Sequence, residues 1–234
     1  MEYFIETSTE SPLSRPEEWD CIITRDTVNL AEKPAPKTPN LPRTKPSISK
    51  LAVVGVVETT NPREVYSKGG AYDLLEVVAT SNEVLERCSM WKIDSVSLDL
   101  STSILTLRKG TVAKAVNNHL YFTIDISPYY SSERRRNWIY NTKELLRLAK
   151  KTHINISVGK MSIPKAEIVD LFKKFKLKEK TIHKMLTTNP ETMLIRAAVK
   201  KYAHQGSIAQ VLSKEAPLKQ MLYRCRTGLK NIKG

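Results

Sequence analysis

Three consecutive arginines, Arg134 to Arg136, are the residues of this 234-residue chain whose type and spacing point most clearly to chemistry. They follow a strand-like segment and a Ser-Pro turn, and they open a segment with helical periodicity. A helix favours acidic side chains in its first turn, because the free N–H groups there carry partial positive charge. A bound phosphate would make arginines favourable there, since backbone N–H groups and forked guanidinium groups both suit it. The alternative is a solvated basic turn with Glu133 as a partial counterion.

The charge of the chain is divided unevenly along its length. Residues 1–133 carry 14 Lys and Arg against 18 Asp and Glu, whereas residues 134–234 carry 24 against 6. The formal charges of the two parts are therefore −4 and +18. Together with a sequence pI near 9.6, this excess predicts a polyanionic partner such as RNA, DNA or an anionic membrane.

Hydropathy and cysteine usage limit the cellular compartments in which we expect the protein. No apolar run approaches the roughly 20 residues of a membrane-spanning helix, and the first residues are acidic and polar rather than a basic and then apolar leader. We therefore expect neither secretion nor membrane insertion. Cys21, Cys88 and Cys225 lie far apart without a CxxC pair, so neither a disulfide framework nor a zinc knuckle is predicted. This usage favours a reducing compartment, the cytosol or the nucleus.

Short β-branched segments alternate with helical segments along most of the chain. Asn82 is the expected cap of one helix, and Pro164 the expected first residue of another. Eight strand–helix units favour a single closed (β/α) TIM-like barrel over an open α/β sheet. We assign the barrel to residues 1–205, with a Pro-rich loop at 31–46 and a short basic helical extension at 206–234. The strong strand candidates are 51–57, 72–79, 95–100, 120–126 and 154–158, and the weaker ones are 3–6, 20–24 and 193–197.

Carboxylates offer a second possible chemistry. Catalytic groups of (β/α) barrels lie at the carboxyl ends of the strands, where this chain has Glu6, Asp26, Glu58, Asp99 and Asp125. Such a ring could bind a metal, but the four histidines are isolated, with no partner at i+2 or i+4. A structural role as caps and salt-bridge partners is the alternative. No P-loop, nucleophile elbow or dinucleotide-binding motif occurs, so we expect no metal and no cofactor.

Four segments, 72–100, 121–130, 154–159 and 187–201, carry a resemblance to a known family. Their order and spacing resemble the thirty-kilodalton protein subunit family of ribonuclease P and ribonuclease MRP, a barrel related to the polymerase-and-histidinol-phosphatase fold. Ser127 and Pro128 fall where the family has Ser-Pro, and an Arg-Arg-x-x-Ile-x-Asn pattern that ends at Asn141 also matches.

The chain departs from the family at two places. Family members commonly carry an arginine shortly before a Gly-Pro ahead of the helix after the seventh strand, whereas this chain has Met-Ser-Ile-Pro at 161–164. Lys160 and Lys165 could supply charge near that loop. The first strand and helix also look shortened, so the resemblance implies a divergent, compacted homologue.

The resemblance implies a non-catalytic, RNA-binding subunit of ribonuclease P or MRP in the nucleus, with other protein subunits as partners and no membrane partner. In such particles the RNA subunit performs the hydrolysis that matures the 5′ end of precursor tRNA. Tyr129 and Tyr130 could stack on unpaired bases, and Trp138 is expected in the core. A metal-dependent phosphoesterase and a free-standing nucleic-acid-binding protein are the alternatives. The expected RNA-binding residues are Arg134, Arg135, Arg136, Asn141, Lys160, Lys165, Lys200 and Lys201.

Overall fold

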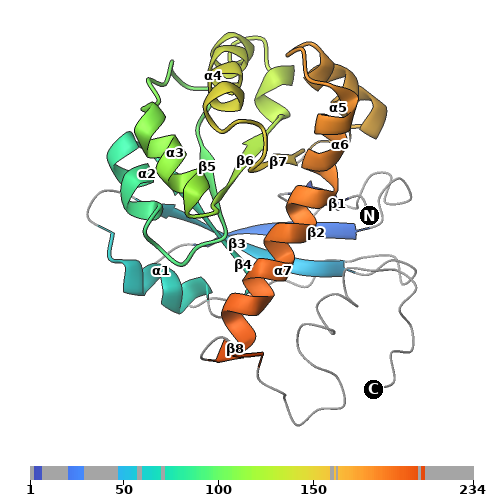
Figure 1. The fold of residues 1–234 in the computed structure, drawn as a ribbon. Coiled ribbons are helices and arrows are strands. Elements are labelled where there is room, and N and C mark those ends of the chain that lie inside the picture. Colours follow the sequence, from blue (N-terminus) through green and yellow to red (C-terminus); the bar gives the residue numbers. More distant parts are fainter. Residues whose placement is uncertain are drawn as a thin grey trace, which may run out of the picture.

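The computed structural model describes residues 3–6, 21–28, 47–56, 60–69, 72–158, 161, 163–204 and 207–208. Within them, seven parallel strands form one sheet in sequence order (Figure 1). A short antiparallel pair, β8 (Ala203–His204) and β9 (Ser207–Ile208), follows the last helix. The strands of the sheet are β1 (Tyr3–Glu6), β2 (Cys21–Val28), β3 (Ser47–Val56), β4 (Leu74–Ala79), β5 (Ser95–Leu98), β6 (Tyr121–Asp125) and β7 (Ile154–Ser157).

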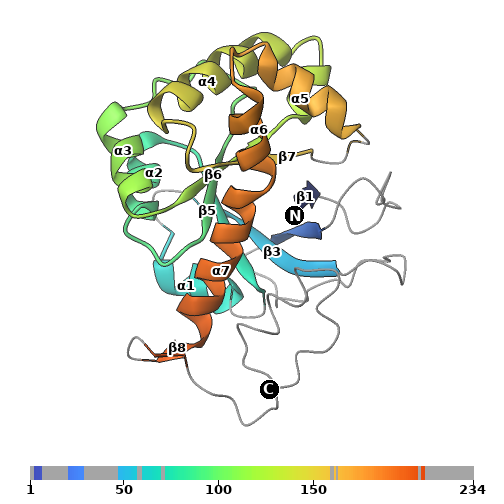
Figure 2. The same ribbon diagram turned by 45° about the vertical axis from the view of Figure 1, so that its right-hand side comes forward.

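Helices connect the strands from β3 onward and cover the outside of the sheet. In both ribbon views α4 and α5 lie at one end of the molecule, and α6 followed by α7 runs from that end to the other (Figures 1 and 2). Among the described residues, no helix is long and apolar enough to cross a membrane. The helices are α1 (Pro62–Gly69), α2 (Asn82–Cys88), α3 (Lys109–Asn117), the 3₁₀ turn η2 (Ser127–Tyr130), α4 (Arg135–Leu148), α5 (Lys165–Lys173), α6 (Glu179–Leu186) and α7 (Thr188–Tyr202).

The predicted α/β class and the parallel sheet are confirmed, and so are the five strong strands and the weaker ones at 3–6 and 20–24. The predicted strand at 193–197 is wrong, because these residues lie inside α7. Met193, Leu194 and Ala197 are buried, and this i, i+1, i+4 spacing fits one helix face as well as a short strand. Within the described residues no hydrogen-bonded pairing joins β1 to β7, so the closed eight-unit barrel is not confirmed.

Two other predictions concern segments at the margin of the described chain. The Pro-rich loop at 31–46 lies outside the described residues. The basic extension at 206–234 does too, apart from Ser207–Ile208, which form β9 instead of beginning a helix.

Local side chains explain where α2 and its neighbouring loop begin. Ser81, rather than the predicted Asn82, caps α2, because its Oγ accepts a hydrogen bond from the Val84 N–H at 3.2 Å. Asn82 instead braces the loop before α3: its Nδ2 donates to the Thr106 carbonyl at 2.8 Å, and its Oδ1 accepts from the Arg108 N–H at 3.0 Å. This brace fixes a loop at the carboxyl ends of β4 and β5.

The two faces of the sheet differ in chemistry. One face is apolar and packs against the helices, as with Val77, Val96, Phe122 and Ile156. The opposite face is buried but polar, and a charged pair, Arg25 and Glu76, lies among its hydroxyl and amide groups. Glu76 accepts hydrogen bonds from Arg25, Ser95 and Thr123 on this face. Arg25 Nε, Ser97 Oγ and Asn155 Oδ1 are buried there without a hydrogen-bond partner among the described residues. The buried polar residues of that face are Arg25, Glu76, Ser95, Ser97, Thr123, Asn155 and Ser157.

Candidate nucleic-acid interface

The amino end of α4 is fixed to the carboxyl end of β6 by a short chain of hydrogen bonds. Asp125 ends β6, and its Oδ1 accepts a hydrogen bond from the Ser127 N–H at 2.9 Å, which starts η2. Trp138, one turn into α4, is fully buried, and its Nε1 donates to the Asp125 carbonyl at 2.7 Å. These bonds hold the first turn of α4 in a fixed position, so the side chains on its outer side project from a rigid support.

Arg135 and the lysine that follows α5 lie around one tyrosine. The Arg135 Nε donates to the Tyr129 carbonyl at 2.6 Å, and its guanidinium carbon lies 5.1 Å from the centroid of the Tyr129 ring. Lys174 donates to the Tyr129 hydroxyl at 3.0 Å, with its Nζ 5.5 Å from the same centroid. Both contacts leave N–H groups of the cations available. Segments almost forty residues apart thus present positive charge at one place.

The side chains of Arg134 and Arg136 are exposed and have no ion-pair or hydrogen-bond partner among the described residues. In particular, no ion pair joins Glu133 to either guanidinium within that part of the chain, so Glu133 is not their direct counterion, and a solvated basic turn stays an alternative. Both arginines lie at the positive end of a 14-residue helix whose first turn contains no acidic residue. Uncompensated cations at that end are unfavourable unless an anion binds there.

Most aromatic side chains near the arginines are buried or already contact other residues of the chain. Trp138 is in the core, as predicted. The ring of Tyr129 faces Arg135 and Lys174, which leaves little of it for a base. The Tyr130 hydroxyl donates to Glu167 Oε1 at 2.9 Å, and burial together with that carboxylate raises the pKa of Tyr130. Little of the Tyr129 ring is therefore left for a base, whereas stacking on Tyr130 stays a prediction, because its hydrogen bond engages only the hydroxyl.

Asn141, predicted as an RNA-binding residue, is completely buried. Its Nδ2 donates to the carbonyls of Leu100 and Ser103 at 2.9 and 2.6 Å, and its Oδ1 accepts from the Leu105 N–H at 2.8 Å. All of its polar groups are thereby engaged in holding the loop after β5 against α4. This position is at odds with direct RNA contact and gives Asn141 a structural role instead.

The sequence model of a family described as RNase P subunit p30 matches residues 17–202. This match covers well over half of the chain. The chain belongs to the RNase P subunit p30 family. The membership confirms the resemblance seen in the sequence and places the chain among protein subunits of a ribonucleoprotein that processes tRNA. No curated protein matches the sequence.

Three further lysines are predicted to bind RNA in this member of the p30 family, and the structure describes the side chain of one of them. Lys160 lies outside the described residues, and the side chain of Lys201 does too. Lys165 is the first residue of α5, where it is half-buried and already interacts within the chain. Lys165 is therefore not a free cation, and RNA contact by Lys160 and Lys201 stays a prediction.

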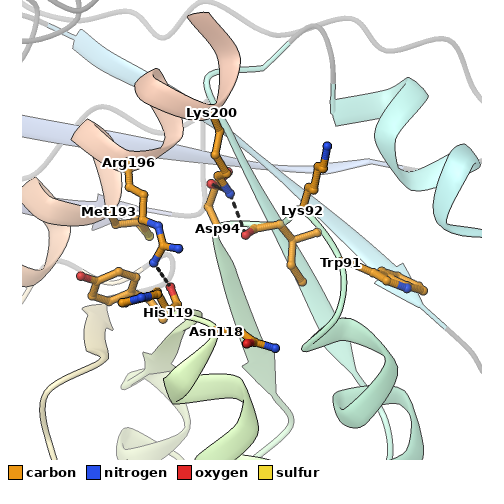
Figure 3. Close-up of a pocket in the computed structure, with 10 residues that line it drawn as sticks. Trp91, Lys92, Asp94, Asn118, His119, Met193, Arg196 and Lys200 are labelled. Atoms are coloured by element: carbon orange, nitrogen blue, oxygen red, sulfur yellow. Dashed lines mark hydrogen bonds and ion pairs between the residues drawn. The ribbon is translucent and has the colours of Figure 1, made fainter. Parts of the chain in front are cut away.

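Lys200 belongs to a clasp at the amino ends of β5 and β6. Its Nζ lies 2.5 Å from Asp94 Oδ1 and donates to the Ile93 carbonyl at 2.8 Å, while Arg196 donates to the His119 carbonyl at 3.3 Å. Figure 3 shows both side chains reaching from α7 toward these groups, around a cavity of about 170 Å³. Burial raises the pKa of Asp94 despite the attraction of Lys200. Lys200 thus serves as a counterion within the p30-family fold.

Replacing Lys200 with methionine should therefore lower stability more than it lowers RNA affinity. The Asp94 carboxylate would remain buried without its cation, at a cost of about 1–3 kcal/mol. Chemical denaturation of the variant measures this loss, and Lys109→Met, at an exposed lysine on α3, is the control. A variant that unfolds like the wild type but binds RNA less tightly would restore Lys200 to the RNA-binding set.

A run of exposed lysines that begins at Lys174 extends the basic surface toward α6. Lys173 pairs with Asp170 and Glu179 at 3.9 and 3.2 Å, but the other lysines of the run make no ion pair within the described residues. Sequence reasoning did not assign them to the site, although the density of lysines in the segment was the available signal. These residues are Lys174, Lys176, Lys178, Lys180 and Lys184.

Two of the carboxylates predicted as possible metal ligands, Asp99 and Asp125, cap turns in the structure. Asp99 accepts hydrogen bonds from the Ser101 and Thr102 N–H groups at 2.9 and 3.2 Å. Burial opposes its ionisation, but these bonds and those of the two hydroxyls outweigh that effect and lower the pKa of Asp99. In the described ranges no three His, Cys, Asp or Glu side chains converge as a metal site. Cys88 is buried, which raises its pKa to about 12 and leaves the thiol protonated.

Proposed function

We propose that this p30-family chain binds RNA as a non-catalytic subunit of ribonuclease P, of ribonuclease MRP, or of both, in the nucleus. Its task is to neutralise phosphates, support the RNA fold and dock other protein subunits, while the RNA subunit hydrolyses the phosphodiester bond. The observation that carries this proposal is the pair of exposed, unpaired guanidinium groups of Arg134 and Arg136 beside the Arg135–Tyr129–Lys174 group.

Physical chemistry favours phosphate as the anion at this place. A guanidinium group is planar, weakly hydrated and able to donate two parallel hydrogen bonds to a phosphate. The Arg134–Arg136 cluster also opens the half of the chain with a formal charge of +18, which attracts a polyanion at long range. Elsewhere on α4 the chain provides its own carboxylate, since Arg147 pairs with Glu144 at 2.5 Å. The absence of any such partner at the amino end of α4, within the described residues, supports an external one.

Affinity purification of the tagged chain from its own cells, followed by sequencing of the co-purified RNA, tests the proposal. We expect the RNA subunit of ribonuclease P or MRP, together with other protein subunits, and imaging of the tagged chain should show it in the nucleus. Recovery of the protein without RNA, or chelator-sensitive nuclease activity that follows the purified protein alone, would contradict the proposal. The second outcome would favour the phosphoesterase alternative.

The salt dependence of binding gives a quantitative prediction. If phosphate neutralisation dominates, log affinity should fall linearly with log salt, with a slope of about −0.7 to −0.9 for each phosphate contacted. Fluorescence anisotropy of a labelled RNA at several potassium chloride concentrations measures this slope. An affinity that does not change with salt would refute the electrostatic account.

A further inference from the structure

The outer face of α4 carries an exposed aromatic ring between two cations. Arg136, Tyr140 and Lys143 follow one another at i, i+4 and i+7, which places them along one side of the helix. The Tyr140 side chain is 56% exposed, and its neighbour Ile139 is 38% exposed. The opposite side of the helix, with Trp138, is buried against the sheet. We call Arg136, Tyr140 and Lys143 the outer stripe.

Tyr140 differs from every other aromatic side chain near the arginine cluster. Trp138 is buried, Tyr130 is bonded to Glu167, and the ring of Tyr129 is occupied by Arg135 and Lys174. The Tyr140 side chain makes no hydrogen bond and no ring contact among the described residues. A large apolar ring that nothing in the fold uses is a candidate contact for a partner.

The charges beside Tyr140 indicate which kind of partner fits. Arg136 and Lys143 are exposed and have no carboxylate partner within the described chain, so a docking surface here stays positive. The cores of protein–protein interfaces are depleted of charged residues, and of lysine in particular. Proteins that bind single-stranded nucleic acid instead combine cations for the backbone with aromatic rings on which bases stack. The outer stripe, in which an aromatic ring lies between two cations, therefore resembles a surface that binds single-stranded nucleic acid.

We propose that the outer stripe binds one unpaired nucleotide of RNA, with its base stacked on Tyr140 and its flanking phosphates at Arg136 and Lys143. Seven helical residues separate the two cations by about 10 Å along the axis, a distance that their long side chains can shorten toward neighbouring phosphates. The inference rests on the proposed function and deepens it, because it assigns recognition of an unpaired base to a residue outside the arginine cluster.

Binding of fluorescein-labelled 12-nucleotide oligoadenylate to the full chain, followed by anisotropy, tests this inference. Tyr140→Ala should weaken binding by about fivefold to a hundredfold, the range for loss of one base–aromatic stack. Tyr140→Phe should bind within twofold of the wild type, because stacking needs the ring and not the hydroxyl. An abasic oligomer of the same length should bind wild type and Tyr140→Ala equally. Met90→Ala, which shortens a side chain that is 63% exposed, is the control.

The outcomes separate this inference from the proposed function. The stacking role is wrong if Tyr140→Ala binds oligoadenylate as tightly as the wild type does. It is also wrong if the substitution lowers the affinity for the abasic oligomer as much as the affinity for oligoadenylate. In both cases RNA binding through the arginines stands. If Tyr140→Ala keeps its RNA affinity but no longer co-purifies with other proteins of the particle, the outer stripe is a protein-docking surface and the inference is overturned. If the wild-type chain binds neither oligomer, the proposed function fails, and this inference fails with it.

Discussion

Replacing Arg134 and Arg136 together with glutamate should weaken RNA binding by roughly a hundredfold or more while leaving the fold nearly unchanged. Each charge-assisted hydrogen bond contributes about 1.5–3 kcal/mol, and the introduced carboxylates would repel phosphate. Folding should tolerate the change, because both side chains are exposed and unpaired in the described structure and glutamate suits a helix amino terminus better than arginine. Thermal unfolding and RNA affinity, measured on the same preparation, give the comparison.

A matched control separates the local site from total charge. Arg63→Glu with Lys109→Glu makes the same change in net charge at two exposed positions on α1 and α3. We expect this control to bind RNA only slightly less tightly and to retain the wild-type salt slope. The slope of Arg134→Glu with Arg136→Glu should become shallower by about 1.4–1.8, as expected when two phosphate contacts are lost. Lost stability with unchanged affinity per folded molecule would show that the arginines are structural.

Arg135 should behave differently from its two neighbours. Its guanidinium already contacts the carbonyl and the ring of Tyr129, so Arg135→Glu removes a bond and a cation–π contact within the fold. Such an exposed cation–π contact contributes about 0.5–1 kcal/mol. A variant that combines Arg135→Glu with Arg136→Glu therefore mixes loss of phosphate contact with a small loss of stability, and the Arg134–Arg136 pair gives the cleaner measurement.

Glu76→Gln should cause the largest loss of stability of any conservative substitution considered for this chain. Glu76 is fully buried and forms an ion pair with Arg25, whose side chain is 6% exposed. Glu76 Oε2 also accepts hydrogen bonds from Ser95 and Thr123 at 2.8 and 2.5 Å. Removing one charge of a buried pair costs about 3–5 kcal/mol, because the other charge remains buried without a partner. For a chain of this size the melting temperature should fall by roughly 6–20 °C.

A second variant shows whether the buried charge is the cause. Replacing both partners, Arg25→Met with Glu76→Leu, removes the two charges together, and buried ion pairs replaced in this way are often no less stable than the original. We therefore expect the double variant to unfold at a higher temperature than Glu76→Gln. Equal stability of Glu76→Gln and the wild type would contradict the buried pair, and so would a double variant that is far less stable than Glu76→Gln.

How much of the fold could be predicted depends on how local its signals are. The strand at β6 and the helix that buries Trp138 follow from alternation and from i, i+3, i+4 spacing within a few residues. The ion pair of Arg25 and Glu76 joins residues 51 positions apart, and neither local sequence predicts it. The apolar run at 193–197 fits either kind of element, so it was assigned to a strand and found in α7.

The candidate site was predictable in its charge and less so in its details. The arginines were evident because three cations at a helix start violate a local preference. The burial of Asn141 and the pairing of Lys200 with Asp94 depend on segments distant in sequence, a loop 36 to 41 residues away and a turn more than a hundred residues away. Tyr140 could have been found from the period of α4, since it lies on the side opposite Trp138 and Leu145.

Ultraviolet crosslinking of the particle purified from its own cells, with mass spectrometry of the crosslinked peptides, tests the central claim most directly. The account predicts that RNA crosslinks fall on the segment at the amino end and outer face of α4, residues 134–143, and that they disappear in the variant with Arg134→Glu and Arg136→Glu. Crosslinks that fall only around the clasp of Asp94 and Lys200, with none between residues 134 and 143, would contradict it.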